Sequence, residues 1–261
     1  MKLAASNIGW NNDQEPEVLE EMGRLGFCGL EIAPTRWFEQ APYERCGDGK
    51  RLSEIYFRDY GLEICSMQSI WYGRSERIAG SSQEYQTLLA YTEKALCFAE
   101  GIGCSNLVFG CPRNREVFSA KEYEIVESFL WDVAELASSH HTVIALEPNP
   151  PIYHTNFVNT TMQAQNLIRR IHHPALQLNL DFGTMIENGE DVQMIEKLVD
   201  IIHHVHISEP RLYAPLCRPE HKMLFDLLSS CGYKRFVSLE MKQTNSAHDI
   251  ITILRYLGEF V

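Results

Sequence analysis

The chain has 261 residues, of which 45% are hydrophobic, enough to build the core of one large domain. It carries 23 lysine and arginine residues against 35 acidic residues, which gives a formal net charge of −12. Because nucleic-acid binding depends on basic side chains that neutralise phosphates, this balance argues against a nucleic-acid partner.

Cysteine use and hydropathy predict a cytoplasmic protein. The eight cysteines form no CxxC pair, and several lie in apolar runs, where a free thiol behaves as a small hydrophobic side chain. The start of the chain turns polar after about ten residues, so we expect no signal peptide. No apolar run approaches the roughly 18 residues of a membrane span, so we also expect no membrane association.

Short apolar or β-branched segments alternate with longer segments of helical periodicity along the whole chain. This alternation is typical of a parallel sheet built from βα units. Because eight such units close a barrel, the predicted fold class is α/β, a (β/α)8 TIM barrel in which residues 1–261 form a single domain. The predicted strands are residues 2–6, 29–33, 62–67, 106–110, 143–147, 176–181, 202–208 and 236–240.

Helices are predicted between these strands, several of them after a Ser, Thr or Asn that can cap the first turn. The predicted helices are residues 15–25, 49–60, 82–101, 118–139, 160–172, 191–200, 221–231 and 246–258. Three long loops, residues 34–48, 68–81 and 148–159, all follow strands. In barrels of this kind the loops after the strands carry the active site.

Four acidic or imidazole side chains lie at the ends of four consecutive predicted strands. Glu147, Asp181, His206 and Glu240 are separated by 34, 25 and 34 residues, each about one βα unit. Because these ends converge in a closed barrel, three carboxylates without a cation would repel one another and raise their pKa values. Three oxygen ligands and one imidazole suit Mn²⁺, Co²⁺, Zn²⁺ or Mg²⁺. The pattern therefore predicts one divalent metal ion bound by these four side chains.

Three further polar residues lie close to this set in the sequence or in the predicted sheet. Glu31, in the second predicted strand, is interpreted as a residue that orients its neighbours. His203 and His204 precede His206 in the same strand but fall on other faces or lower layers, so we expect packing or supporting roles for them.

The segments IALEP, NLDFG, HVHISE and GYKRFVSLEM, which contain the four candidate ligands, resemble the sugar phosphate isomerase/epimerase superfamily with its xylose-isomerase-like TIM barrel. The resemblance covers essentially the whole chain, beginning with GFCGLEIAP at residues 26–34. Members of that superfamily include ketose 3-epimerases, hydroxypyruvate isomerase, inosose dehydratase, 3-dehydroshikimate dehydratase and endonuclease IV. The resemblance is specific for the fold and the metal site and leaves the substrate open.

The resemblance implies that Glu147, Asp181, His206 and Glu240 are metal ligands, and that Glu147 and Glu240 also act as acid and base beside the reacting carbon. The implied activity is that of a metal-dependent isomerase or epimerase acting on a small sugar or sugar phosphate through an enediolate. A metal that holds a carbonyl and a neighbouring hydroxylate stabilises such an intermediate. Two carboxylates on opposite faces can remove and return the proton.

The chain departs from the ketose 3-epimerases at three positions that contact substrate in those enzymes. Thr184 stands where they carry a histidine, Leu212 where they carry an arginine, and Tyr153 where they carry an acid. These differences argue against a ketose epimerase of the usual type. Endonuclease IV is disfavoured as well, because the places of its additional histidines hold Met67-Gln68 and Phe109-Gly110.

Five residues are predicted to bind substrate. Trp71 could cover an apolar sugar face, and Arg113 could bind a carboxylate or phosphate through its guanidinium fork. Arg211 is adjacent to the position of the epimerase arginine. Asn149 comes just after Glu147 in EPNPPIY. Lys242 follows Glu240 by two residues, which predicts that it shares the strand face of that glutamate.

Alternatives remain open at this point. The same proton loss followed by departure of a β-hydroxyl would make the protein a metal-dependent lyase, a dehydratase acting on a polyhydroxy carbonyl compound such as dehydroshikimate or an inosose. A metal-bearing binding protein without turnover is a third hypothesis. In each case the expected partner is a small carbohydrate, and the resemblance implies a possible homodimer.

Overall fold

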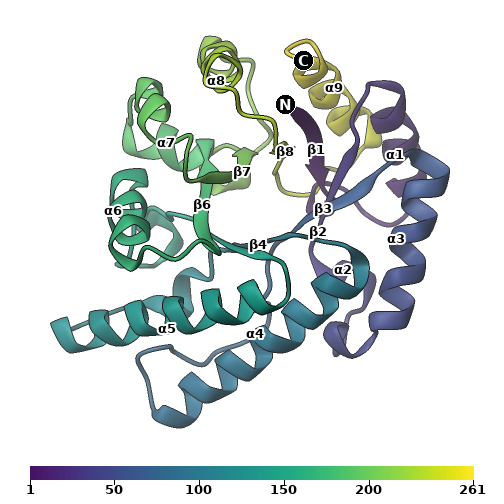
Figure 1. Cartoon of the computed structure of the whole chain (residues 1–261). Coiled ribbons are helices and arrows are strands. Elements are labelled where there is room, and N and C mark those ends of the chain that lie inside the picture. Colours follow the sequence, from purple (N-terminus) through teal and green to yellow (C-terminus); the bar gives the residue numbers. More distant parts are fainter.

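The computed structural model describes residues 1–261. Eight parallel strands pair in chain order and β8 pairs with β1, so the sheet closes into a barrel surrounded by helices (Figure 1). This arrangement confirms the predicted (β/α)8 fold. The strands are β1 Lys2–Ser6, β2 Gly29–Ile32, β3 Glu63–Met67, β4 Asn106–Phe109, β5 Val143–Leu146, β6 Leu176–Asp181, β7 Ile202–Ile207 and β8 Phe236–Leu239.

Most of the connecting helices follow the predicted ones closely. Helix α4, for example, begins with a capping box in which Ser81 and Glu84 satisfy each other's backbone N–H groups, and it ends at Gly103, whose φ of 76° suits glycine. The helices are α1 Glu15–Arg24, α2 Pro34–Trp37, α3 Cys46–Tyr60, α4 Ser82–Ile102, α5 Ala120–Ser139, α6 Thr161–Ile171, α7 Phe182–Asn188, α8 Pro219–Ser230 and α9 Ala247–Gly258.

The region after β6 differs from the prediction. Helix α7 starts directly at the end of the strand, because the Asp181 carboxylate accepts the backbone N–H of Thr184 at 2.6 Å and caps the helix. It ends after seven residues at Gly189, too short for a helical periodicity to stand out in the sequence. The helix predicted at 191–200 is a short 3₁₀ helix, Val192–Lys197. Helix α2 likewise falls within a segment predicted as a loop.

The inside of the barrel is polar, whereas the layer between sheet and helices is apolar. In β7, buried Val205 and Ile207 alternate with buried His204 and His206. Since strand residues alternate between the two faces, each strand can present one chemistry to the helices and another to the barrel axis. The polar axis connects the two ends of the barrel.

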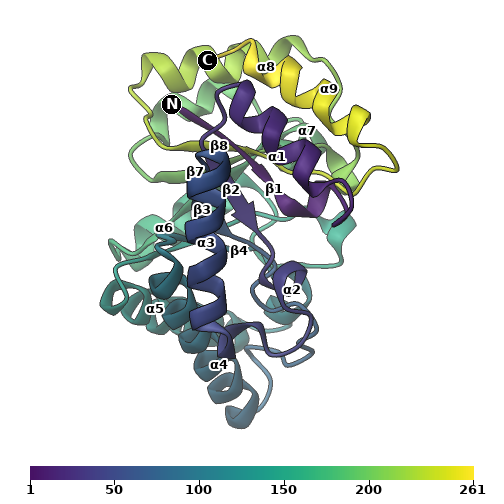
Figure 2. The same ribbon diagram turned by 90° about the vertical axis from the view of Figure 1, so that its right-hand side faces the viewer.

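The two chain ends lie close together, as Figures 1 and 2 both show. The C-terminal α9 packs against α1, which follows the first strand. No helix in the chain combines the length and apolar character that crossing a bilayer would require.

Candidate active site

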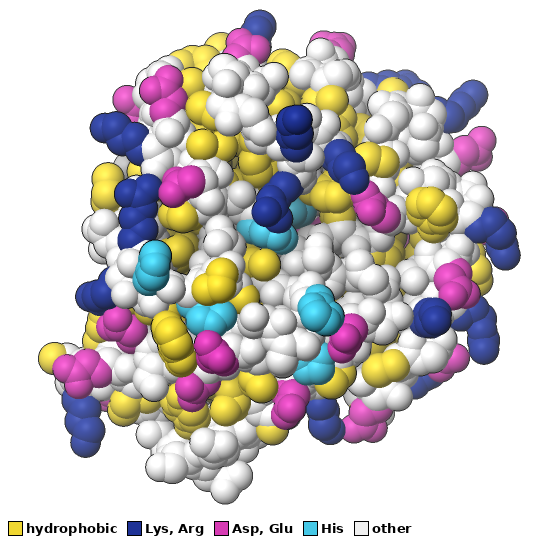
Figure 3. All heavy atoms as spheres, in the orientation of Figure 1, with side chains coloured by type: hydrophobic (Ala, Val, Ile, Leu, Met, Phe, Trp, Pro, Cys, Tyr) yellow, Lys and Arg dark blue, Asp and Glu magenta, His cyan; other side chains and the backbone are white.

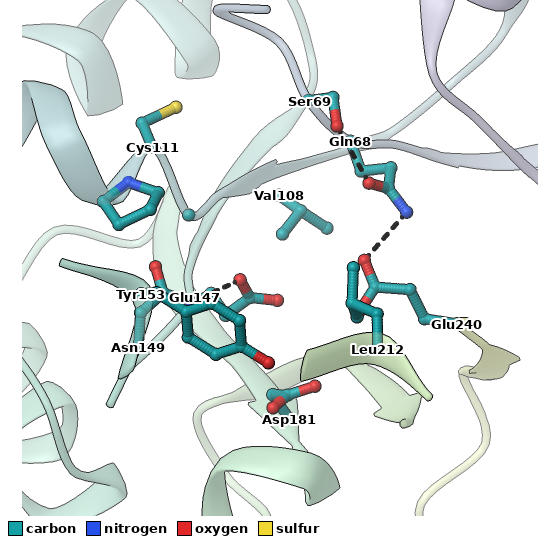
Figure 4. Close-up of a pocket in the computed structure, with 12 residues that line it drawn as sticks. Gln68, Ser69, Val108, Cys111, Glu147, Asn149, Tyr153, Asp181, Leu212 and Glu240 are labelled. Atoms are coloured by element: carbon teal, nitrogen blue, oxygen red, sulfur yellow. Dashed lines mark hydrogen bonds between the residues drawn. The ribbon is translucent and has the colours of Figure 1, made fainter. Parts of the chain in front are cut away.

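Four side chains meet at the carboxyl ends of β5 to β8. Glu147 and Glu240 directly follow β5 and β8, Asp181 ends β6, and His206 is the last but one residue of β7. One potential ligand atom from each lies within 4.8 Å of the others. Figure 4 shows the three carboxylates facing one pocket, Glu147 and Glu240 from different sides. The spacing of one βα unit thus places four ligand-type groups around one point.

His206 is held in one orientation by carboxylates on both sides of its ring. Nε2 lies 3.0 Å from Glu31 Oε2, and Nδ1 lies 3.1 Å from Glu147 Oε1 and 3.2 Å from Glu240 Oε2. Glu31 is completely buried, so its contact fixes the ring from below. A hydrogen bond from Nε2 to Glu31 leaves Nδ1 facing the cluster with a lone pair suited to a metal. Glu31 therefore has the orienting position expected of it.

The two glutamates are positioned by neutral amides. Asn179 Nδ2 donates to Glu147 Oε1 at 2.7 Å, and Asn149 Nδ2 donates to Glu147 Oε2 at 2.8 Å. Gln68 Nε2 donates to Glu240 Oε1 at 2.9 Å. These donors fix the carboxylates without neutralising them, so the charge of the cluster is left for a bound cation.

Asp181 is anchored by the segments that follow β6 and β7. Its carboxylate accepts the backbone N–H of Thr184 and, at 2.5 Å, the hydroxyl of Ser208. The Thr184 side chain donates in turn to the carbonyl of Pro148 at 2.9 Å. Thr184 therefore ties the end of β6 to the loop after β5.

The electrostatics of the cluster reflect the crowding of its acids. Burial, together with the charges of Glu147 and Asp181, raises the pKa of Glu240 to about 7 against the opposing effect of His206. Burial and the charge of Glu147 also raise the pKa of Asp181. Burial alone would lower the pKa of His206, but the charges of Glu240 and Glu31 outweigh it and raise that pKa well above its ordinary value.

Glu147 behaves differently from the other two carboxylates. Burial raises its pKa, but the hydrogen bond and charge of His206 and the hydrogen bond from Asn149 outweigh that effect, so the net pKa is lowered. Two imidazoles, His204 and His206, thus stand against four carboxylates when Glu31 is included; Glu147 is half-buried and the other three are buried. Three carboxylate oxygens and an imidazole nitrogen fit a divalent cation, which would supply the missing positive charge.

The cluster opens into a pocket of about 200 Å³ at the end of the barrel. Its walls include Gln68, Ser69, Asn149, Tyr153 and Leu212, and no lysine or arginine lines it. The Tyr153 hydroxyl accepts the backbone N–H of Arg211 at 2.8 Å, which fixes the ring at the pocket mouth. Burial and the charge of Asp181 raise the pKa of Tyr153, so its hydroxyl keeps its proton.

Of the five predicted substrate contacts, only Asn149 lines this pocket. The structure places Trp71 in the core instead, with 3% of its surface exposed. Its Nε1 donates to Thr92 Oγ1 at 2.9 Å, and its ring packs edge-on against Phe109 and Phe129. The expectation of a sugar-stacking Trp71 is therefore corrected, because the loop after β3 turns this ring towards α4 and α5.

Arg113, Arg211 and Lys242 are exposed and do not line the pocket. Arg211 has a left-handed backbone with φ of 64°, and the neighbouring Leu212 reaches the pocket in its place. The Lys242 ammonium lies 5.2 Å from the ring of Tyr213. These three residues were expected to bind substrate, and the structure places none of them at the cluster.

A buried arginine supports the pocket wall from behind. Arg115 is completely buried at the end of the 3₁₀ helix Pro112–Arg115. Its guanidinium donates to the carbonyl of Glu147 at 2.8 Å and to Asn149 Oδ1 at 2.9 Å. Burial lowers its pKa to about 10, so it remains a cation. The loop after β4 thus holds both residues that form the wall after β5.

Two functional positions that the sequence analysis did not single out as site residues lie on the first half of the barrel. Gln68 directly follows β3 and Gly110 directly follows β4. A Cβ atom at Gly110 would lie 2.8 Å from Glu147 Oε2, so the glycine leaves room for this carboxylate. The signal that identifies Glu147 and Glu240, namely the first position after a strand, would have found both.

The sequence model of the xylose isomerase-like TIM barrel family matches residues 19–258. The chain belongs to this family. The match spans every strand except β1. Family membership agrees with the closed barrel and with the placement of the acidic cluster at the strand ends.

Known proteins similar to the chain have related but differing activities. A protein of Xenopus laevis named "Putative hydroxypyruvate isomerase" is 28% identical, and the alignment covers 91% of this chain and 89% of that protein. An inosose dehydratase of Geobacillus thermodenitrificans is 22% identical over 86% of this chain and 76% of its own length. Among solved structures, the 3-keto-D-glucoside 4-epimerase of E. coli superimposes over the full length of both chains, with a TM-score of 0.78 and 18% identity.

Proposed function

We propose that the protein is a metal-dependent isomerase or epimerase that acts on a small polyhydroxy carbonyl compound through an enediolate. The observation that carries the proposal is the convergence of Glu147, Asp181, His206 and Glu240 on one point, with the three carboxylates lining the pocket. The similarity to a protein named for hydroxypyruvate isomerisation supports this class of reaction.

The metal ligands would be Glu147, Asp181 and Glu240 through carboxylate oxygens and His206 through Nδ1. When bound, a divalent ion such as Mn²⁺, Co²⁺, Zn²⁺ or Mg²⁺ would polarise the substrate carbonyl and stabilise the negative charge that develops on its oxygen. Glu31 orients the imidazole for this role.

Glu147 and Glu240 are the proposed acid and base. They come from β5 and β8 and approach the pocket from different sides, so a carbon held between them would be accessible on both faces. One carboxylate removes the proton next to the carbonyl, and the other returns a proton to the same carbon or to its neighbour. The amides of Asn179 and Gln68 hold the carboxylates in place for this transfer.

The pocket favours an uncharged substrate over a phosphorylated one. No lysine or arginine lines it, so a phosphate would have no cationic side chain to pair with inside the pocket. Ser69, Asn149 and Tyr153 instead offer hydroxyl and amide groups, which match the hydroxyls of a sugar. A volume of about 200 Å³ restricts the substrate to a small molecule.

The proposal is tested by deuterium exchange. The purified protein, supplied in turn with Mn²⁺, Co²⁺, Zn²⁺ and Mg²⁺, is incubated in D₂O with free ketoses and aldoses and with their phosphates. NMR then follows deuterium at the carbon next to the carbonyl and the appearance of a second sugar. We expect exchange with a free sugar, and slower or no exchange with its phosphate.

Two variants make this experiment decisive. Glu147→Gln should abolish exchange, whereas Glu39→Gln, a change at an exposed residue far from β5 in sequence, should leave it intact. Exchange at equal rates in the Glu147→Gln protein and the unchanged protein would contradict the proposal, and so would its absence with every sugar and metal.

A dehydratase is the second candidate, and the similarity to an inosose dehydratase favours it. The first step would be the same proton removal by Glu147 or Glu240, and loss of a neighbouring hydroxyl would follow. The two reactions differ in product. A growing ultraviolet band of a conjugated carbonyl would identify the dehydratase, and a second sugar without such a band would identify the isomerase.

A further inference from the structure

A second cavity, of about 170 Å³, lies at the opposite end of the barrel from the candidate active site. Residues at the amino ends of the strands line it: Lys2 begins β1, Asn106 begins β4 and Phe236 begins β8. We call it the floor cavity. None of its residues belongs to the pocket of the candidate active site.

The rim of the floor cavity is positively charged. Lys2, Lys234 and Arg235 all line it. Lys2 is paired with Glu63 at 2.7 Å, but Lys234 and Arg235 form no ion pair with any residue of the chain. In the space-filling view, lysine or arginine side chains gather around a histidine near the middle of one face (Figure 3). Such a group stands out on a chain with a net charge of −12.

The base of the floor cavity is built from polar groups, of which Asn106 is buried and His203 is half-buried. His203 Nδ1 lies 2.7 Å from Asn106 Oδ1, and Asn106 Nδ2 donates to Ser66 Oγ at 2.8 Å. His203 Nε2 has no hydrogen-bond partner within the chain. Because Asn106 Oδ1 accepts the proton on Nδ1, the neutral His203 ring is left with Nε2 as an acceptor. An acceptor at the base suits the P–OH group of a protonated phosphate, and the cationic rim suits its charged oxygens.

We propose that the floor cavity binds a phosphate-sized oxyanion, with Lys234 and Arg235 as the principal contacts. The guanidinium of Arg235 can bind two oxygens of such a group, and the Lys234 ammonium adds a second positive charge. Two unpaired cations, Lys234 and Arg235, at one small cavity match a single small anion rather than an extended polyanion. The ligand is therefore free phosphate or the phosphoryl group of a small metabolite.

The floor cavity is connected to the candidate active site through the barrel axis. His204 lines the cavity, and its Nε2 lies 3.0 Å from Glu31 Oε2. The same oxygen lies 3.0 Å from His206 Nε2. Because phosphate could also bind at a metal in the active site, the experiment must report on the floor cavity alone.

The test follows the imidazole NMR signals of His203 during titration with inorganic phosphate, with the signals assigned by their loss in His203→Gln. We expect a saturable shift of the His203 signals. In the double variant Lys234→Gln/Arg235→Gln the apparent dissociation constant should rise about tenfold or more. The signals of His206 report separately on any binding at the active site.

The matched control is Lys50→Gln/Arg51→Gln, which removes an adjacent exposed lysine and arginine from α3. It changes the net charge by the same amount and should leave the His203 titration unchanged. A parallel titration with glycerol 3-phosphate distinguishes the two sources. Tighter binding of inorganic phosphate identifies free phosphate as the ligand, and tighter binding of glycerol 3-phosphate identifies the phosphoryl group of a metabolite. A His203 shift that does not saturate, or that is the same in the floor double variant, overturns the proposal. Neither result bears on isomerase activity.

Discussion

The two halves of the barrel end in different chemistry at the same rim. The ends of β6 and β7 carry Asp181 and His206, and the residues directly after β5 and β8 are Glu147 and Glu240. Each of these four strands therefore brings a charged or metal-binding side chain to the rim. By contrast, β1 ends at Ser6, Gln68 directly follows β3 and Gly110 directly follows β4, and these three residues are neutral. Gln68 Nε2 donates to Ser6 and to Glu240, so a side chain of the neutral half orients the carboxylate of Glu240 in the charged half.

A metal held by these four residues would be bound by β5 to β8 alone. A ligand set drawn from all eight strands would close around the ion and leave no place for substrate. A set drawn from one half leaves the other side of the ion facing Ser69, Val108 and Gly110 across the pocket. Open coordination positions on that side are what carbonyl chemistry requires.

The largest effect is expected from removing the metal from the charged half. Chelation should abolish deuterium exchange, and adding back the correct divalent ion should restore it. Because the ion binds only the folded state, a free metal concentration of 100 times its dissociation constant would stabilise the protein by about 2.7 kcal/mol. Thermal unfolding with and without chelator measures this. An active, chelated protein with an unchanged melting temperature would contradict a metal centre.

Replacement of the proposed acid and base comes next. Glu240→Gln should lower kcat by about 10²–10⁴-fold, the usual contribution of general acid–base catalysis. The amide keeps the size of the side chain, so the fold should be preserved. Steady-state kinetics and circular dichroism on the same preparation separate the two effects. A kcat within a few-fold of the unchanged protein would show that Glu240 transfers no proton.

Glu31 lies in the neutral half but acts on the charged half through His206. Glu31→Gln replaces the carboxylate that fixes Nε2, and metal affinity should fall about 10- to 100-fold, as for other groups that orient a metal-bound histidine. Competition with a metal-sensitive dye measures the affinity. The exposed Glu54→Gln on α3 is the control. Equal metal affinity in both variants would remove Glu31 from the site.

Gly110 tests the neutral half directly. Gly110→Ala places a Cβ atom 2.8 Å from Glu147 Oε2, so the carboxylate must move. Because misplacement by about 1 Å can cost on the order of 10²-fold in rate, kcat/KM should fall about 10- to 100-fold. The obstacle is the end of a flexible side chain, so the melting temperature should change little. Normal kinetics in the alanine variant would show that Glu147 has freedom to adjust.

The smallest effect is expected at the opposite end of the barrel, where it concerns the pH dependence of stability. Burial and the charge of Arg235 lower the pKa of His203 to about 3, below its ordinary 6.5. The neutral ring therefore contributes stability that is fully present above about pH 6.5 and is lost as the pH falls towards 3, because the unfolded chain takes up the proton first. Denaturant unfolding between about pH 7 and pH 4.5 should show a smaller loss of stability in His203→Gln. An identical loss would mean that His203 is not held neutral.

Much of the fold follows from the sequence because periodicity and strand-end chemistry repeat with each βα unit. The ends of the predicted strands fall within one residue of those in the structure. The convergence of Glu147 and Glu240 could be predicted for the same reason, since the carboxyl ends of parallel strands meet at one rim. Gln68 also lies at a strand end, but its amide is uncharged, so the search for acidic and imidazole side chains did not select it.

The loop residues could not be predicted in this way. Trp71 and Arg113 lie in loops that have no period, so the sequence gives no information about which way their side chains point. The structure turns Trp71 into the core and Arg113 into solvent. Similarly, Arg211 has a left-handed backbone, and the side chain that lines the pocket is that of Leu212 and not that of Arg211. Side-chain direction in these loops depends on tertiary packing.

The buried guanidinium of Arg115 joins two loops that are adjacent in space and separate in the chain. Because Arg115 donates to the backbone of Glu147 and to the side chain of Asn149, it is a buried anchor shared by the segments after β4 and β5. Replacing only the segment after β5 would leave the buried Arg115 guanidinium without its acceptors, and replacing only the segment after β4 would leave the Glu147 carbonyl without its donor. Engineering a new specificity into this barrel would therefore require both segments to be transplanted as one unit.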